Sequence, residues 1–411
     1  MTPANRSFAP LAAAHFLTSF NSNFMKNALV FLVVASLPLH EAEAMSSFVS
    51  AVFMLPMIFM SGFGGQLADR YDRSVLSTFL KAAELLAVAV AAVGVSVGSY
   101  WITLAGVILL QVVGSLFGPV RSSLIPSLVA PEAVPRANAW IEGLSFAAMI
   151  SGLWFVGFAF GLPSDQRTMA TIAVLLVAAL SFSAVRFIPK GLTAGSANTV
   201  DWNLFKGTWR TLMEAVAEKT LVKPIIILGW SWFVASLALS TAPALVARTG
   251  GSSADMSWLM IAYGVAGAVA AQVVARVRWI RSPMAVVSVA LAGQAIAAAG
   301  VWAAATHMAP MWMSVALCLL GALHAMVLIP LASLIQTTAA PERRARSAAA
   351  SNIINAIFMV VGGLGVAGVQ AIGVSLPVIY AVAAIGSVCA AMTARRVRSP
   401  ARRDPACRDW G

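Results

Sequence analysis

The sequence predicts an all-α polytopic membrane protein, with twelve transmembrane helices arranged as two six-helix pseudo-repeats. Three observations support this prediction. The chain has 411 residues, 60% hydrophobic and only 10% charged, whereas a soluble domain carries about 25% charged residues. Apolar runs of about 20 residues, enough to cross the hydrocarbon core of a bilayer, recur along the whole chain. A short motif of the first half also returns about half a chain later.

The expected spans divide into two sets of six. The first set lies near residues 11–37, 46–66, 75–98, 101–121, 137–160 and 169–188. The second set lies near residues 222–247, 256–275, 283–305, 311–335, 347–373 and 376–394. The expected domains are therefore an N-terminal bundle at 1–188, a cytoplasmic linker at 189–221, a C-terminal bundle at 222–395 and a basic cytoplasmic tail at 396–411.

Basic residues concentrate in alternate loops. The loops after the second, fourth and sixth expected spans carry most of them in the first half, among them Arg70, Arg73, Arg121, Arg136, Arg186 and Lys190. Since Lys and Arg are enriched in cytoplasmic loops, both termini are expected in the cytoplasm. The net charge of +12 therefore reflects membrane topology, and no nucleic-acid partner is expected.

The linker between the two sets contains an amphipathic pattern. Aromatic and aliphatic residues recur at helical spacing opposite charged ones, and they are Trp202, Phe205, Trp209 and Leu212. Asp201 is the expected N-cap. The pattern predicts a helix lying on the inner membrane surface, and a solvated linker helix is the alternative.

An internal repeat supports the division into halves. The segment from Leu124 to Trp140 resembles the segment from Leu334 to Asn352, and Pro341 follows Pro131 by 210 positions. A shift of about half the chain is expected when two homologous six-helix halves are joined.

The first span carries polar residues where apolar ones are expected. Asn23, Lys26 and Asn27 are spaced i, i+3, i+4, so they share one face of a helix. A charge near the bilayer centre costs about 3 kcal/mol on insertion scales. We expect this face to line a transport path.

Other charged residues at membrane depth also fall in the first half. Lys81 and Glu84 are three residues apart and either neutralise each other or contact substrate. Arg121 ends the fourth expected span, as an anchor or as a ligand for substrate. Glu142, in the fifth span, either pairs with an arginine or contacts substrate. In the second half, His324 is expected to be a hydrogen-bonded packing residue.

The loop GGQLADRYDR follows the second span. Its pattern Gly65-x-x-x-Asp69-Arg70-x-x-Arg73 resembles the signature loop of the major facilitator superfamily. The resemblance implies a gating loop that locks one face of a transporter and releases it during alternating access. Physically, Gly65 permits close helix packing, and Asp69 can accept hydrogen bonds from a helix N-terminus and pair with Arg70 or Arg73.

Several stretches of the first half together resemble the bacterial lysophospholipid transporters of this superfamily. They are FNSNFMKNALV, GQLADRYDR, KAAELL, FGPVRSSLIP and NAWIEGLSFAAMISG. The resemblance implies an inner-membrane flippase that moves lysophosphatidylethanolamine-type lipids to the cytoplasmic leaflet for reacylation by alternating access. It also implies functional coupling to a separate acyltransferase. The family pattern has an Asp where this chain has Ser22, so Lys26 is the charge that this helix offers.

We therefore hypothesise that Lys26, with Arg121, binds the substrate phosphate, while Glu142 or Glu84 meets the ammonium group. The runner-up is a proton-coupled drug or metabolite exporter with Glu84 or Glu142 as proton carrier. A non-transporting scaffold is a third reading, which the gating loop and the buried charges disfavour. An enzyme is least expected, because the sequence shows no nucleophile–base pattern. No cofactor and no metal site are expected, since Cys318, Cys389 and Cys407 lack metal-binding spacing.

Overall fold

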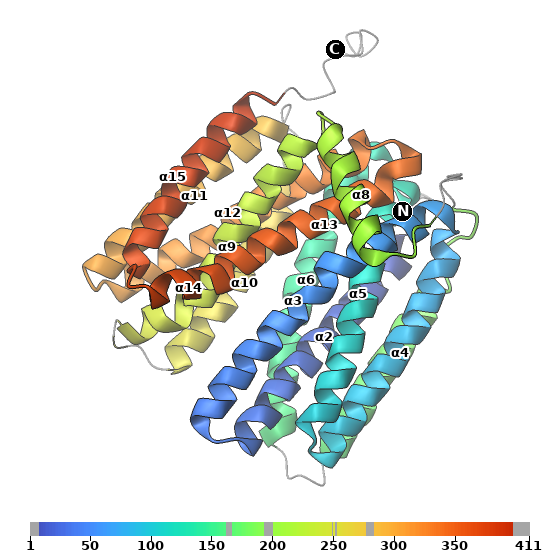
Figure 1. Cartoon of the computed structure of the whole chain (residues 1–411), viewed down its shortest axis with the longest axis horizontal. Helices are drawn as coiled ribbons and strands as arrows, with labels where there is room; N and C mark the ends of the chain where they lie inside the picture. The colour runs from blue at the N-terminus through green and yellow to red at the C-terminus, as the bar shows by residue number, and fades with distance from the viewer. Residues whose placement is uncertain are drawn as a thin grey trace. The chain divides into compact units, whose positions relative to one another are not determined.

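A computed structural model describes residues 8–161, 167–192, 200–248, 250, 253–276 and 283–397. Within these residues the regular secondary structure is helical and contains no strand (Figure 1), so the all-α prediction is confirmed. Part of the expected linker, Arg278, Arg281 and the tail from residue 398 onward lie outside the described residues.

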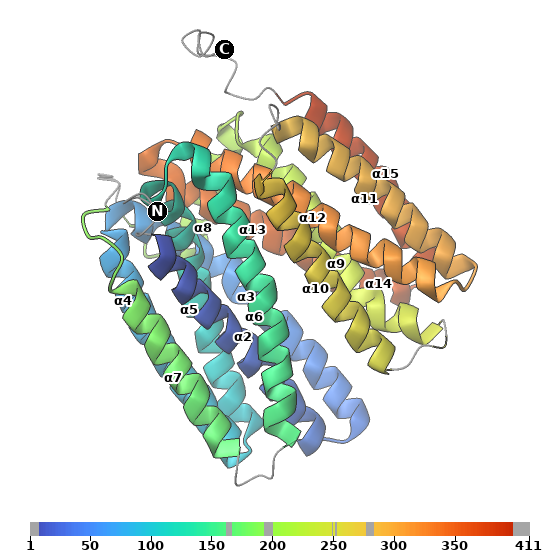
Figure 2. The ribbon, with the colours of Figure 1, turned by 180° about the vertical axis from the view of Figure 1, so that it is seen from behind.

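Six long helices match the first six expected spans. They are α2 (Phe8–Ser36), α3 (Leu39–Arg70), α4 (Arg73–Val97), α5 (Tyr100–Leu128), α6 (Val134–Gly161) and α7 (Arg167–Val185). Helices α3, α4 and α5 face the viewer in Figure 1, and α2, α6 and α7 face the viewer in Figure 2. The expected linker helix is α8 (Leu204–Ala217).

The second set of spans is matched in the same order. Its helices are α9 (Val222–Arg248), α10 (Ser253–Arg276), α11 (Pro283–Thr306), α12 (Pro310–Thr338), α13 (Arg344–Val360), α14 (Val366–Ala371) and α15 (Leu376–Arg395). A π-helical turn, η4 (Val361–Gly365), joins α13 to α14, so these three pieces form the eleventh span.

The helices have the dimensions that membrane spans require. Among the described residues, nine helical stretches are long and apolar enough to cross a membrane, and α10 adds the shorter apolar stretch Trp258–Val274. Helices α2 and α3, of 29 and 32 residues, rise about 43 and 48 Å at 1.5 Å per residue, more than the ~30 Å hydrocarbon core. The chain is a multi-pass membrane protein with a twelve-helix fold.

The chain forms two compact units. Unit 1 comprises Met1–Ala215 and Ala340–Ala356, and unit 2 comprises Val216–Ala339 and Ile357–Gly411. The start of the eleventh span therefore belongs to unit 1, although it comes late in the sequence. The domain boundaries expected from the repeat stay a prediction.

In unit 1, short capped turns join neighbouring helices. The Asp72 carboxylate accepts hydrogen bonds from the backbone N–H groups of Ser74 and Val75 and so caps α4. The same helix ends at Gly98, whose φ of 72° lies in the left-handed region that glycine adopts without strain. Ser99 then caps α5 by accepting from the N–H of Ile102. These caps hold α4 and α5 as an antiparallel pair.

In unit 2, close backbone approach sets the packing. A Cβ added at Gly362, in the π-helical turn, would lie 2.5 Å from the carbonyl oxygen of Phe233 on α9. A Cβ added at Gly386, on α15, would meet the ring of Trp230. Unit 2 has its own apolar core, in which Tyr263 and Tyr380 are the buried aromatic residues.

The repeated motif has the same local structure at both positions. Pro131–Ala133 forms one turn of 3-10 helix before α6, and Pro341–Arg343 forms one before α13. In each copy a proline occupies the first turn, where its missing N–H leaves no hydrogen bond unmade. The repeat is thus structural as well as sequential.

Two local expectations are wrong. Helix α5 does not end at Arg121 but continues to Leu128 with Pro119 and Pro126 inside it, because neighbouring helices allow proline within membrane helices. The N-cap of α8 is Asn203, whose side chain accepts from the N–H of Lys206 at 3.0 Å. Asp201 instead accepts from the N–H of Asn203 at 3.1 Å.

Candidate functional site

Lys81 and Glu84 form a buried ion pair on α4, with 2.5 Å between Nζ and Oε2. The hydroxyl of Thr18, on α2, donates to Oε1 of Glu84 at 2.7 Å and accepts from the Lys81 ammonium. Ser181, on α7, lies 3.1 Å from that hydroxyl, and the Lys81 Nζ lies 4.1 Å from the ring centroid of Phe117 on α5. The two charges neutralise each other, and contacts from α2, α5 and α7 hold them in place. This geometry agrees with a structural role for the pair. Substrate contact by Glu84 stays a prediction.

A second polar chain crosses unit 1 from α5 to α6. The guanidinium of Arg121 donates to Nδ1 of His15, on α2, at 2.8 Å. Since arginine can only donate, Nδ1 carries no proton and the neutral ring donates from Nε2. Its acceptor is the hydroxyl of Ser145, on α6, at 2.7 Å, and that hydroxyl donates to the carbonyl of Ile141 at 3.0 Å. One face of Arg121 is thereby fixed.

Glu142 belongs to the same neighbourhood. Its carboxylate interacts electrostatically with Arg121, and its side chain is only half-buried. The Nε of Arg121 is buried and has no hydrogen-bond partner among the described residues. Arg121 and Glu142 thus place one donor-rich cation and one carboxylate within electrostatic range of each other without a direct ion pair among the described contacts, and these are the two charge types that a zwitterionic headgroup needs.

The polar face of α2 is partly satisfied within its own helix. The amide nitrogen of Asn23 donates to the carbonyl of Ser19 at 2.8 Å, and that of Asn27 donates to the carbonyl of Asn23 at 2.7 Å. Asn23, Lys26 and Asn27 are all half-buried. With their amide nitrogens engaged, Asn23 and Asn27 offer their amide oxygens as acceptors.

Asn21 lies apart from that face. It is fully buried, and its amide nitrogen donates to the carbonyl of Val174, on α7, at 3.1 Å. Helix α6 also packs closely on α2, since a Cβ added at Gly152 of α6 would lie 2.9 Å from the carbonyl oxygen of Phe20 and 3.0 Å from Cβ of Asn23. Asn23 therefore lies where α6 approaches α2 closely.

The signature loop contacts the first turn of α13. The Asp69 carboxylate is fully buried and accepts from the backbone N–H groups of Ala345 and Arg346 at 3.1 and 3.3 Å. The guanidinium groups of Arg346 and Arg73 lie 3.6 and 3.9 Å from its oxygens. A carboxylate at a helix N-terminus is stabilised by the exposed N–H groups and the helix dipole.

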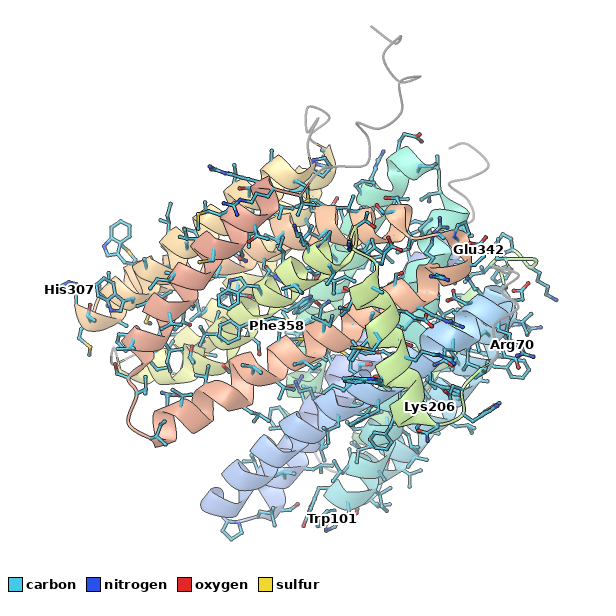
Figure 3. The ribbon with its side chains drawn as sticks, turned by 45° about the horizontal axis from the view of Figure 1, so that its top comes forward. Arg70, Trp101, Lys206, His307, Glu342 and Phe358 are labelled. Carbon is cyan, nitrogen blue, oxygen red and sulfur yellow. The ribbon has the colours of Figure 1, made fainter. Side chains whose placement is uncertain are left out.

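The other residues of the loop surround this contact. A Cβ added at Gly65 would lie 2.8 Å from Cβ of Ala349, so glycine lets α3 and α13 touch. Arg73 also donates to the Ser127 hydroxyl at 3.2 Å and to the Pro341 carbonyl at 3.4 Å. Arg70, by contrast, is exposed at the end of α3 (Figure 3). The structure thus brings together Gly65, Asp69 and Arg73 but leaves Arg70 outside.

Helix α8 extends the charge cluster. Arg346 lies 3.4 Å from Glu214 of α8, and Arg210 lies 3.8 Å from both Glu214 and Asp201. The buried face of α8 consists of small residues, which are Gly207, Thr208, Thr211 and Ala215. The aromatic face of α8 is exposed, with Phe205 and Trp209 72% and 64% accessible, and Trp202 just before the helix is 76% accessible. Lys206 of this helix is also exposed (Figure 3).

Unit 2 contains a neutral polar cluster around His324. The Ser231 hydroxyl lies 2.9 Å from Nδ1 of His324 and accepts from the amide of Gln294 at 2.9 Å. The ring of Trp232 stands edge-on to the imidazole, with centroids 4.5 Å apart. Nε2 of His324 and Oε1 of Gln294 have no hydrogen-bond partner within the described residues. His324 is thus hydrogen-bonded on one side.

Sequence reasoning missed several partners of the expected site residues. His15 contacts Arg121 and Thr18 contacts Glu84, each from another helix. Ser145 and Ser181 in turn bond His15 and Thr18. His15 carried a signal, because it is a titratable residue in an apolar run. The hydroxyl residues carried none, since serine and threonine commonly donate to carbonyls within their own helix.

A model of the Major Facilitator Superfamily matches residues 11–363 of this chain. The chain is also 25% identical over 199 residues to the lysophospholipid transporter LplT of Photorhabdus laumondii, which covers 47% of this chain and 46% of that protein. The match therefore spans about half the length of this relative.

Solved transporter structures share the fold. The human organic anion transporter MFSD10 superposes with a TM-score of 0.81 at 15% identity, covering 96% of this chain and all of that one. The fucose:proton symporter FucP of E. coli gives 0.73 at 11% identity, with 95% and 98% covered. At these identities the similarity concerns the fold alone.

Proposed function

The chain belongs to the Major Facilitator Superfamily and is a membrane transporter, and on that premise we propose that its substrate is a lysophospholipid of the phosphatidylethanolamine type. In this proposal the protein moves the lipid to the cytoplasmic leaflet of a bacterial inner membrane, where a separate acyltransferase restores the second acyl chain. The similarity to LplT over half its length supports this substrate class.

One observation carries the proposal: unit 1 holds two opposite charges of its helices within electrostatic range of each other. Arg121 and Glu142 interact, and Arg121 keeps a buried N–H without a partner in the described residues. A headgroup with a phosphate and an ammonium complements this pair, because the phosphate accepts from guanidinium and the ammonium donates to carboxylate. Lys26 supplies further positive charge for the phosphate.

The role of Glu84 in this proposal is secondary. Its carboxylate already receives hydrogen bonds from Lys81 and Thr18. To bind the ammonium group of a substrate, the Glu84 carboxylate would have to give up the Lys81 ammonium. Glu142 is therefore the preferred partner of the substrate ammonium, and Asn23 and Asn27 offer amide oxygens on the same helix as Lys26.

We further propose that the protein works by alternating access, with Gly65, Asp69 and Arg73 as the lock. The support is the buried contact of the Asp69 carboxylate with the N-terminus of α13. Its hydrogen bonds cross between helices far apart in sequence, so their breakage permits one helix to move relative to the other. Arg70, which is exposed, is proposed to anchor the loop at the cytoplasmic surface.

The test follows labelled lysophosphatidylethanolamine into spheroplasts that contain or lack the protein. Lys26→Ala and Glu142→Ala are each expected to reduce transfer by at least about tenfold, since a hydrogen bond to a charged group is worth roughly 1.5–3 kcal/mol. The matched controls, Lys206→Ala and Glu132→Ala, remove the same charges from exposed positions and are expected to leave transfer unchanged. Unchanged transfer in both site variants would contradict the proposed site.

A protonophore added to the same assay separates this proposal from a proton-coupled exporter. We expect lysophospholipid transfer to continue without a proton gradient. Loss of transfer with the protonophore, together with loss in Glu142→Ala, would assign Glu142 a proton-carrying role instead.

A further inference from the structure

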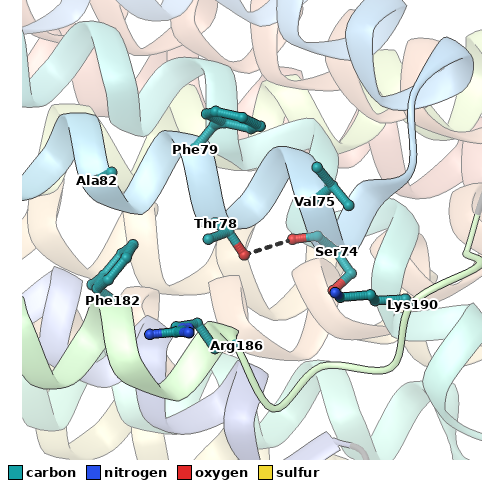
Figure 4. Close-up of a pocket in the computed structure, with 8 residues that line it drawn as sticks. All are labelled: Ser74, Val75, Thr78, Phe79, Ala82, Phe182, Arg186 and Lys190. Carbon is teal, nitrogen blue, oxygen red and sulfur yellow. Dashed lines mark hydrogen bonds between the residues drawn. The ribbon is translucent and has the colours of Figure 1, made fainter.

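A surface groove runs between α4 and the end of α7, and its lining includes no residue of the proposed substrate site. Its volume is about 480 Å³, and its lining comes from eight residues: Ser74, Val75, Thr78, Phe79, Ala82, Phe182, Arg186 and Lys190. Along the groove, Phe182, Arg186 and Lys190 succeed one another opposite Ala82, Thr78 and Ser74 (Figure 4). The groove therefore has an aromatic end and a basic end.

The aromatic end is continuous with the apolar surface of the spans. Phe79 is 72% exposed, and the next outward residues on the same two helices, Leu86 and Leu180, are also exposed. Because α4 and α7 cross the membrane, such exposed apolar side chains face the acyl chains of lipids. An acyl chain is thus the natural occupant of this end.

The hydroxyl groups of the groove are already engaged. The Thr78 hydroxyl donates to the carbonyl of Ser74 at 3.1 Å (Figure 4). The Ser74 hydroxyl donates to the carbonyl of Ile188 at 2.9 Å. Because these hydroxyl groups need no hydrogen bond from a ligand, a hydrocarbon chain can lie against the wall without leaving a donor unsatisfied.

The basic end carries two exposed cations, Arg186 and Lys190. Neither forms an ion pair with an acidic side chain of the described residues. The neighbouring carboxylate, Asp72, accepts from the N–H groups of Ser74 at 2.8 Å and Gly191 at 2.5 Å. The bond to Gly191 fixes the backbone next to Lys190 at the mouth of the groove, and Asp72 forms no ion pair with either cation among the described contacts.

We propose that this groove binds one phospholipid with an anionic headgroup, whose phosphate lies between Arg186 and Lys190 and whose acyl chain follows Phe79 and Phe182. Basic pockets between helices at a membrane surface are suited to acidic lipid headgroups. A zwitterionic lipid fits less well, since its ammonium group would approach two cations. The bound lipid is a lasting ligand rather than cargo, so the proposal holds whichever substrate is transported.

The test titrates the purified full-length protein in detergent with phosphatidylglycerol or with phosphatidylcholine of the same acyl chains, and counts bound lipid by native mass spectrometry. Arg186→Gln/Lys190→Gln is expected to weaken phosphatidylglycerol binding about thirtyfold, since each basic residue near an anionic lipid contributes about 1 kcal/mol. Binding of phosphatidylcholine is expected to stay unchanged.

A matched control removes two exposed charges outside the groove, in Arg136→Gln/Lys219→Gln, and is expected to bind phosphatidylglycerol as the parent does. For the apolar end, Phe79→Ser is expected to weaken binding of both lipids, whereas Leu109→Ser, on α5 and 48% exposed, is expected to have no effect. All four variants alter exposed positions.

Three outcomes would overturn the proposal. An equal loss in the control double variant would make the binding a non-specific effect of net charge. Equal affinity for soluble glycerol phosphate would make the groove a free-anion site. Displacement of phosphatidylglycerol by equimolar lysophosphatidylethanolamine, lost in Arg186→Gln/Lys190→Gln, would place the groove on a transport path instead.

Discussion

Lys81 and Arg121 differ in where the sequence places their nearest polar partner: on the same helix for Lys81, and on a helix far away in sequence for Arg121. Lys81 pairs with Glu84 three residues later on α4. Arg121 instead donates to His15, 106 residues earlier. The first kind of partner is visible in a sequence because helical spacing identifies it, and the second kind is not.

For the first kind, we predict strongly non-additive effects of substitution. Lys81→Met leaves the buried Glu84 carboxylate without its cation and is expected to lower the free energy of unfolding by about 3–5 kcal/mol. The double variant Lys81→Met/Glu84→Leu is expected to recover most of that loss, because neither charge remains. Thermal unfolding in detergent measures both variants.

The transport assay on the double variant then decides the role of Glu84. Retained lysophospholipid transfer would identify the pair as structural. Lost transfer in a variant of restored stability would show that Glu84 contacts substrate. Lys206→Met, at an exposed position, is the control and should change stability by less than about 0.5 kcal/mol.

Among the elements, the contact of α3 with α13 depends on the absence of a side chain at Gly65. The helices touch where a Cβ would lie 2.8 Å from Cβ of Ala349 and 3.0 Å from the carbonyl oxygen of Ala345. The Asp69 carboxylate bonds the first turn of α13 one helical turn further along. The close approach at Gly65 and the capping carboxylate of Asp69 therefore both join α3 to α13.

We predict that Gly65→Ala forces these helices apart. Overpacking costs typically 1–3 kcal/mol, so Gly65→Ala should lower the unfolding temperature and reduce transport. The matched control is Gly114→Ala on α5, where an added Cβ meets no atom within 4 Å. There the higher helix propensity of alanine should stabilise the protein by up to about 1 kcal/mol. Equal effects at both positions would contradict the close contact.

The elements themselves were largely predictable, because length and hydropathy define a membrane span. One expected range is too short: the fourth span was expected to end at Arg121, but α5 continues to Leu128 with Pro119 and Pro126 inside the helix. The cap of α8 was also misplaced, since Asp201 and Asn203 are both good capping residues and only the backbone decides between them.

For the whole molecule, the basic residues predict one orientation. Arg70, Arg186 and Lys190 follow even-numbered spans, whereas the turn at Gly98 between α4 and α5 carries no charge. The positive-inside rule then places both termini in the cytoplasm. Sequence alone supports this orientation, because it depends on loop composition and not on packing.

Reporter fusions test that orientation. A green fluorescent protein joined to the C-terminus should fluoresce, since it matures in the cytoplasm, and an alkaline phosphatase at the same position should be inactive. A phosphatase joined after Gly98 should be active, because that turn is expected on the outer side. The reversed pattern would refute the orientation and with it the leaflet proposed for the transported lipid.

The candidate site was predictable only in part. Sequence identified Lys26, Arg121 and Glu142 because charges are conspicuous in apolar helices. It did not identify how Arg121 is held, since His15 and Ser145 come from two other helices. Contacts between distant segments depend on the packing of the whole unit, which no local pattern encodes.

The pairing of Lys81 with Glu84 has a consequence for how the chain is made. Because the partners are one turn apart, they can neutralise each other as soon as α4 is helical, before any other helix is in place. Helix α4 can therefore leave the insertion machinery as a nearly neutral segment. Helix α5 enters the bilayer with Arg121 and depends on α2, synthesised earlier, to supply His15. Because α2 is synthesised before α5, the acceptor His15 is already present in the membrane when Arg121 is inserted.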